Sequence, residues 1–272
     1  MPRSTEGRII TAPPYPIQAR SGLHVHSFDG ALSLRSLRHP HRAFAFEVTC
    51  DLDHPAVRAA LQADPPQKPP RHFHPHQAEY FQVMQGQAVV EAEIGGRAGM
   101  HRLQAGRQGV ADDSEFCVPA GAHHTWYPSI AQVEDGRERN DSTNDISSRR
   151  DYGVSRVVVS GDTTPELLRL DWAFFENWYS YQDACFKKGR AIDLIQVMCM
   201  YDAGGSYLSL PGWVPLGRST AVVLGIVIGR WLGGLLGYRP YYREWTTDWE
   251  LACEKMDTCW LYRRGTKPVK PT

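Results

Sequence analysis

The chain has little that would hold a highly charged partner or form a disulfide scaffold. Its 30 basic and 30 acidic side chains cancel, and the basic residues form no block of the length that binds nucleic acid. Its six cysteines are scattered through 272 residues without a Cys-x-x-Cys pair, so reduced thiols are expected. We therefore expect a small-molecule ligand and no nucleic-acid partner.

Several sequence patterns of catalysis and targeting are also missing. No nucleophile with an adjacent base, phosphate-binding loop or dinucleotide-binding fingerprint occurs, which argues against a hydrolase, a kinase and a Rossmann-type enzyme. The N-terminal stretch MPRSTEGRIITAPPYPIQARS contains no apolar run of signal-peptide length. These absences predict a cytoplasmic protein.

Between about residue 20 and residue 160 the sequence is typical of a mainly β fold. In the segment QAVVEAEIGG, every second residue from Ala88 to Ile94 is apolar, the residues between them are mostly polar, and a Gly-Gly turn follows. This alternation predicts a strand over 87–94 with one buried face. The sequence also predicts a short surface helix at 53–64 and strands at 43–50, 78–84, 115–120, 123–128 and 155–161. Many short strands at close spacing favour a sandwich or a barrel.

After Thr164 the sequence changes to that of a helical region. Helix formers and aromatics replace the alternating pattern, Pro165 is compatible with a helix start, and Thr247 to Glu250 form the capping-box pattern of a last helix that Gly265 would end. We therefore expect a β domain with an N-terminal arm over 1–163 and a helical extension over 164–272. The polar segment 134–151 is expected to be a loop.

The segment 218–239, RSTAVVLGIVIGRWLGGLLGYR, raises the question of a membrane. Its longest uncharged run has eleven residues, whereas a spanning helix needs about 18 to 20. Gly225, Gly229 and Gly233 would share one helical face and allow close packing on the β domain or in a homodimer. We favour a buried or dimer-forming helix over membrane association through 218–238, while a tilted or interfacial helix stays open.

One stretch, RHFHPHQAEYFQVMQG at 71–86, concentrates side chains that bind metals. In an extended segment His72 and His74 project from the same face, and Glu79 can enter the same cavity from the next strand once Pro75 has made a turn. A His-x-His pair alone is weak support for a metal site, because a histidine in a strand is usually a satisfied polar residue.

A second stretch, VPAGAHHTWYP, strengthens the metal hypothesis. It supplies Pro119, Gly121 and His124 in the pattern P-x-G-x-x-H, downstream of H-x-H-x4-E-x6-G at 72–86. Together these resemble the two signature motifs of the cupin superfamily over about residues 65–130. The second motif departs at Asp113, where the family has glycine, and at Pro128, where it has asparagine, and neither is a ligand position.

The resemblance implies both a fold and a metal site. The fold would be a double-stranded β-helix, a jelly-roll barrel, here with a C-terminal α-helical extension. The family's ligand positions fall on His72, His74, Glu79 and His124. Such a set suits one divalent transition metal, Fe, Mn, Ni, Cu or Zn, and ligand softness does not choose among them.

Strand parity extends the site to a substrate pocket. With Glu79 facing inward, Phe81 and Val83 should face inward too, and Trp126 should follow His124. His123 should then point outward, and His76 is expected at the rim, within reach of a substrate. The alternative is that these apolar residues only fill the interior of the barrel and contact no substrate.

Two hypotheses about function follow. In the first, the protein is a metal-dependent enzyme with Glu79 as a catalytic residue, an oxygenase, isomerase or cyclase for a hydrophobic or aromatic small molecule. The Trp-, Tyr- and Gly-rich tail loosely resembles that of uncharacterised fungal cupins, which implies secondary metabolism. In the second, it is a non-catalytic binding or scaffold protein with a structural metal, whose C-terminal helix docks on a partner or a membrane.

Overall fold

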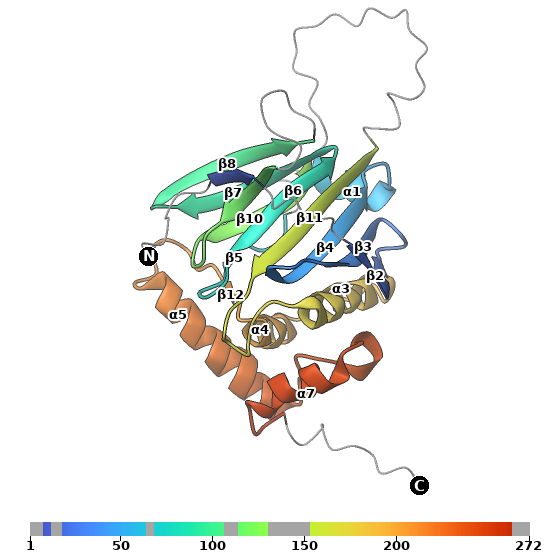
Figure 1. The fold of residues 1–272 in the computed structure, drawn as a ribbon. Helices are drawn as coiled ribbons and strands as arrows, with labels where there is room; N and C mark the ends of the chain where they lie inside the picture. The colour runs from blue at the N-terminus through green and yellow to red at the C-terminus, as the bar shows by residue number, and fades with distance from the viewer. Residues whose placement is uncertain (1–7, 12–17, 64–67, 106–113, 130–152, 263–272) are drawn as a thin grey trace, which may run out of the picture.

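The strands form two antiparallel sheets, and most of the helices lie beneath them (Figure 1). The structure is a computed structural model, and it describes residues 8–11, 18–63, 68–105, 114–129 and 153–262. The prediction of a mainly β fold is confirmed, since the strands form two antiparallel sheets. The double-stranded β-helix stays a prediction.

The larger sheet has seven strands and the smaller has five. In spatial order the larger contains β1 (Arg8–Thr11), β9 (Ser114–Val118), β6 (Glu79–Gln85), β11 (Val154–Asp162), β4 (Arg42–Asp51), β3 (Leu32–Arg38) and β2 (Gln18–Ser27). The smaller contains β12 (Tyr207–Leu208), β5 (His72–Phe73), β10 (His123–Ser129), β7 (Gln87–Ile94) and β8 (Arg97–Gln104).

The predicted strands are present, with bounds that differ from the prediction by at most two residues. The predicted surface helix is α1 (Pro55–Gln62). Strands β1, β2, β3, β8 and β12 were not predicted, and β8 is mostly exposed with little apolar alternation to mark it. The predicted loop at 134–151 and the predicted stop at Gly265 lie outside the described residues.

Apart from α1, the described helices all begin later than the change in sequence at Thr164. They are α3 (Trp172–Lys187), α4 (Leu194–Ala203), α5 (Gly217–Leu224), the π-helix η1 (Gly225–Gly233), α6 (Gly234–Leu236), the short 3-10 turn η2 (Arg243–Trp245) and α7 (Trp249–Asp257). The helix start predicted at Pro165 is wrong, because Asp171 is the residue whose side chain caps α3, accepting from the Phe174 amide at 3.0 Å.

The start of the last helix also differs from its prediction by one residue. Asp248 caps α7 by accepting from the Leu251 amide at 3.1 Å. Thr247, the expected cap, instead donates its hydroxyl to Glu176 of α3 at 2.8 Å. A tertiary hydrogen bond has replaced the local one, which a capping pattern in the sequence does not reveal.

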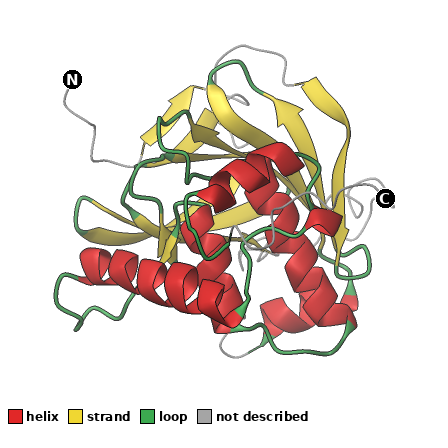
Figure 2. Ribbon diagram, turned by 90° about the horizontal axis from the view of Figure 1, so that it is seen from below, coloured by secondary structure: helices red, strands yellow, loops and turns green. Residues whose placement is uncertain are grey.

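The strands and the helices share one hydrophobic core. Seen from below, the helices lie across the strands (Figure 2). The Phe175 ring of α3 packs on the Phe46 ring of β4 with centroids 4.3 Å apart, and β12 extends the smaller sheet by pairing Tyr207 with Phe73. The later part of the chain therefore helps to build the β structure. The division at 163/164 stays a prediction.

Candidate metal centre

The four predicted metal ligands come together in the structure. His72 lies on β5 directly opposite His124 on β10, His74 follows β5, and Glu79 begins β6. One nitrogen or oxygen from each side chain lies within 4.8 Å of the others. Antiparallel pairing of two short strands therefore brings residues 52 positions apart into one cluster.

Each of the three imidazole rings is oriented by a hydrogen bond at Nδ1. The Nδ1 of His72 lies 2.9 Å from the Pro70 carbonyl, that of His124 lies 3.0 Å from the Ala122 carbonyl, and that of His74 lies 2.8 Å from the Ser206 hydroxyl. A carbonyl acceptor holds the proton on Nδ1 and leaves Nε2 for the centre of the cluster.

Ser206 is a residue that the sequence analysis missed. It follows α4 after a Gly-Gly turn and is fully buried, 132 positions from His74. Its hydroxyl lies 3.5 Å from the Gly204 carbonyl, to which it donates, so its oxygen can accept the Nδ1 proton of His74. A serine after two glycines carries no signal of this role in the sequence.

His74, Glu79 and His124 are buried, His72 is half-buried, and the cluster holds one carboxylate among the imidazoles. Burial alone would raise the pKa of Glu79, but the hydrogen bond from His124 at 2.9 Å and the nearby His74 ring, whose Nε2 lies 3.6 Å from the carboxylate, lower it below its usual range. Burial lowers the pKa of His72 and of His74, and for His72 the neighbouring imidazoles His124 and His74 lower it further. His72 and His74 are therefore neutral and can offer a lone pair.

One atom of the cluster has no partner. Nε2 of His74 is buried and makes no hydrogen bond, which is costly for a polar atom. A metal ion between the rings would satisfy it, and three imidazole nitrogens with one carboxylate are a donor set typical of divalent transition metals. The residues present therefore fit a metal ion.

Aromatic rings line the cavity of about 200 Å³ beside this cluster. Trp126 of β10 forms part of the wall, as parity predicted, and α3 and α4 supply Phe174, Phe175, Trp178, Tyr179, Gln182 and Tyr201. The sequence analysis missed these helical residues. Strand parity identifies side chains that face into a barrel but does not indicate which helix covers its opening.

Three residues predicted to contact a substrate do not line this cavity. Phe81 is buried behind it, with its ring packed on Trp126 at a centroid distance of 5.7 Å. Val83 lies further along β6 and packs against the core. His76 is exposed in the turn after His74.

His123 points away from the cluster, as expected for the neighbour of an inward residue. Its Nδ1 lies 2.7 Å from the Ser209 hydroxyl, and Arg218 donates to its Nε2 at 3.3 Å. Its side chain lines a separate surface groove with Arg218 and Glu93.

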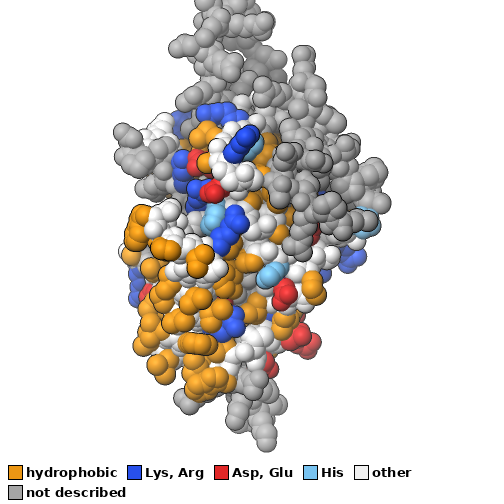
Figure 3. Space-filling view, turned by 90° about the vertical axis from the view of Figure 1, so that its left-hand side faces the viewer, with side chains coloured by type: hydrophobic (Ala, Val, Ile, Leu, Met, Phe, Trp, Pro, Cys, Tyr) orange, Lys and Arg blue, Asp and Glu red, His pale blue; other side chains and the backbone are white. Residues whose placement is uncertain are grey.

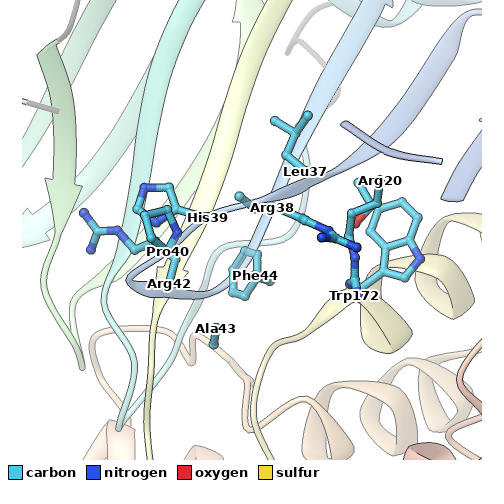
Figure 4. A pocket seen from close by; sticks show the side chains of 11 residues that line it. Arg20, Leu37, Arg38, His39, Pro40, Arg42, Ala43, Phe44 and Trp172 are labelled. Carbon is cyan, nitrogen blue, oxygen red and sulfur yellow. The ribbon is translucent and has the colours of Figure 1, made fainter. Parts of the chain in front are cut away.

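A larger groove of about 590 Å³ lies elsewhere, between the β3–β4 connection and Trp172 (Figure 4). It is basic, but the Arg42 guanidinium is already paired with Glu115 at 3.1 Å and Asp162 at 2.5 Å. Among its described lining residues His39 is the one side chain of a type that binds metals. The smaller cavity is therefore the better candidate site.

Comparison of the sequence with known proteins found fungal relatives. The chain is 42% identical to the probable oxidoreductase yanE of Aspergillus niger over 87% of this chain and 81% of that protein. It is 43% identical to the oxidoreductase macE of Penicillium terrestre over 75% and 68%. The epoxidase atD of Aspergillus terreus is 38% identical over 74% of this chain and 54% of its own length.

Comparison with family models gave no match. Among solved structures, CapF of Staphylococcus aureus has a TM-score of 0.30 and 12% identity, over 56% of this chain and 32% of that chain. An oxalate oxidase bound to glycolate has a TM-score of 0.29 and 14% identity, over 52% and 55%. TM-scores this low carry no argument about the present chain.

Proposed function

Since the chain belongs to the family of fungal proteins that includes yanE and macE, we propose that it is a metal-dependent oxidoreductase for a hydrophobic, aromatic small molecule. The observation that carries the proposal is the convergence of His72, His74, Glu79 and His124 beside an aromatic cavity. The names of the relatives support an oxidation, and that of atD suggests an epoxidation. We place the reaction in secondary metabolism.

The proposed fold for this activity is the cupin double-stranded β-helix. Support comes from the way in which the two sequence motifs meet, because the Gly121 amide donates to the His74 carbonyl at 2.7 Å. Gly121 has a φ of 80°, a left-handed conformation that favours glycine in the P-x-G turn. This turn positions His124 at the start of β10, across from His72.

A metal ion held by His72, His74, Glu79 and His124 would supply Lewis acidity and, if redox-active, the electron transfer that dioxygen chemistry requires. His124 Nδ1 lies 3.0 Å from the Ala122 carbonyl, and its Nε2 lies 2.9 Å from Glu79 Oε2, so this ring and the carboxylate already face each other across the cluster.

The cavity residues would bind and orient the substrate. Trp126, Phe174 and Trp178 offer ring faces to a flat molecule and exclude water from it. Burial raises the pKa of Tyr179 and Tyr201, so both phenols stay protonated and can donate to a substrate oxygen. Among the described residues that line the cavity, Glu79 supplies the carboxylate, and we assign it the catalytic role beside the metal.

Dioxygen uptake tests the proposed activity. The purified protein, reconstituted with Fe(II), Mn(II), Ni(II), Cu(II) or Zn(II) in turn, would be assayed with a panel of phenols and quinols. We expect uptake that requires both a redox-active metal and a substrate, and that is lost in His74→Ala but kept in His76→Ala. A product with the mass of its substrate and no uptake would indicate an isomerase or cyclase instead.

A second candidate is a non-catalytic binding or scaffold protein with a structural metal. The exposed apolar side chains along α5, η1 and α6 favour it, because a docking protein needs such a surface. The same assay distinguishes the two candidates. A fully metal-loaded protein that binds a phenol without any turnover would support the scaffold and contradict the enzyme.

A further inference from the structure

The residues 217–236 form one continuous helix through α5, η1 and α6, and its outward side is apolar. Val223, Val227, Trp231 and Leu235 recur every four residues, and all four are exposed, Leu235 by 72%. We call these four residues the outer stripe. Figure 3 shows hydrophobic side chains gathered on this side of the molecule. A surface helix of a soluble protein normally carries polar residues there.

The opposite side of the helix is already occupied by the protein itself. Gly225, Gly229 and Gly233 are buried, and a Cβ on Gly229 would lie 2.4 Å from the Met198 carbonyl of α4. The small-residue face that could have formed a homodimer is therefore used within the chain. The helix packs closely on α4 and lies along the body of the protein (Figure 1).

The helix is longer and more apolar than the run of eleven uncharged residues suggested. Its 20 residues are sufficient by length and composition to cross a membrane, and only 22% of its most apolar part is buried, unlike a core helix. Arg230, which interrupts the run, is held within the protein by Asp202 at 2.7 and 2.9 Å. Because the guanidinium is paired with Asp202, no charged side chain of this helix interrupts the outer stripe.

Charge and aromatic residues around the stripe favour a lipid surface over a second copy of the chain. Besides the paired Arg230, the chain from residue 203 to 243 has three arginines and no acidic residue or lysine, which suits anionic headgroups. Trp213, exposed by 82%, and Leu216 extend the apolar surface beyond the helix, and Trp231 lies within it. Tryptophan is the side chain that membrane interfaces favour.

We propose that the outer stripe, with Trp213 and Leu216, docks the protein on the surface of a lipid bilayer that contains anionic lipids. The helix lies flat in the headgroup region, because its glycine side stays packed on α4. Docking removes the exposed valine, leucine and tryptophan side chains from water. The proposal does not depend on the chemistry of the metal centre.

Co-sedimentation with vesicles of phosphatidylcholine and phosphatidylserine tests the docking. We expect the full chain to bind these vesicles. High salt should release part of the bound protein, because it screens the attraction between the arginines and the anionic headgroups. Trp231→Glu and, separately, Val227→Glu should each lower the bound fraction at least about tenfold, since a charge cannot enter the apolar layer without a large penalty.

Met100→Glu is the matched control, because Met100 is an equally exposed apolar residue on β8, away from the helix. It should bind vesicles like the unchanged chain, and all variants should keep the same denaturation midpoint. A monomer that does not bind the vesicles would overturn the proposal. So would equal binding by the Trp231→Glu and Val227→Glu variants, or a dimer in sedimentation velocity that these variants abolish.

Discussion

At the scale of single residues, the hydroxyl of Ser206 holds the His74 ring in the orientation that a metal ion needs. Ser206→Ala removes the acceptor at 2.8 Å from Nδ1 and frees both the tautomer and the rotation of the ring. Loss of such a partner typically weakens metal binding by about 10- to 100-fold. A competitive titration against a chelator would measure that change.

Ser209→Ala is the matched control for this prediction. Its hydroxyl makes the same kind of contact, 2.7 Å from the Nδ1 of His123, but that histidine faces away from the cluster. We expect its metal affinity to be unchanged. Equal losses in the two variants would show that Ser206 acts through general stability and not through His74.

The titrating residues of the cluster predict how acid affects the metal-free protein. Burial lowers the pKa of His72 and His74 below 6.5 in the folded state, so the unfolded chain binds more protons below that pH. The lowered pKa of Glu79 acts in the same direction at more acidic pH. The free energy of unfolding should therefore fall as the pH drops below about 6.5.

Urea denaturation of the metal-free protein at a series of pH values checks this dependence. His74→Ala lacks one of the buried imidazoles and should lose stability less steeply with falling pH. His76→Ala changes an exposed histidine and should follow the unchanged chain. A His74→Ala variant with the steepness of the unchanged chain would contradict the account.

The sequence allowed the ligands to be predicted but not their surroundings. His72, His74, Glu79 and His124 follow from two short motifs, because motif spacing is a local property of the chain. Ser206, Trp178 and Tyr201 reach the same place only through the packing of α3 and α4. Such contacts depend on tertiary structure, which local patterns do not encode.

At the scale of elements, the glycines of the 217–236 helix set how closely it approaches α4. In Gly229→Ala the new Cβ would meet backbone atoms of Met198 and Cys199, which cannot move as a side chain can. We expect a loss of about 1–3 kcal/mol in the free energy of unfolding, measured with a chemical denaturant.

Gly217→Ala serves as the control in the same helix. No described atom lies within 4 Å of a Cβ at this position, so alanine should be tolerated or slightly stabilising. If Gly229→Ala were as stable as Gly217→Ala, the close approach of the helix to α4 would be refuted.

Element prediction succeeded where one face of a strand is buried and failed where a tertiary contact decides. Strand β7 has the predicted bounds 87–94, because its alternation matches the pleat. The starts of α3 and α7 were misplaced since Asp171 and Asp248 cap them, and Glu176 takes the hydroxyl of Thr247. A local pattern lists the candidate caps, and packing selects among them.

At the scale of the whole molecule, the helical part completes the site that the strands begin. The strands and the turn after β5 supply the four ligands, and the helical part supplies Ser206 and most of the aromatic wall. The 217–236 helix packs against α4 and β12, so the proposed membrane-facing surface and the cavity are built on neighbouring elements. The change in sequence composition predicted a β domain and a separate helical extension, whereas buried side chains of both parts pack in one hydrophobic cluster.

The central claim is that His72, His74, Glu79 and His124 hold one divalent transition metal. Elemental analysis of the purified chain and of two variants tests it most directly. We predict about one equivalent of metal in the unchanged chain and in His76→Ala, whose histidine is exposed, and almost none in His74→Ala. The same metal content in His74→Ala as in the unchanged chain would contradict the claim.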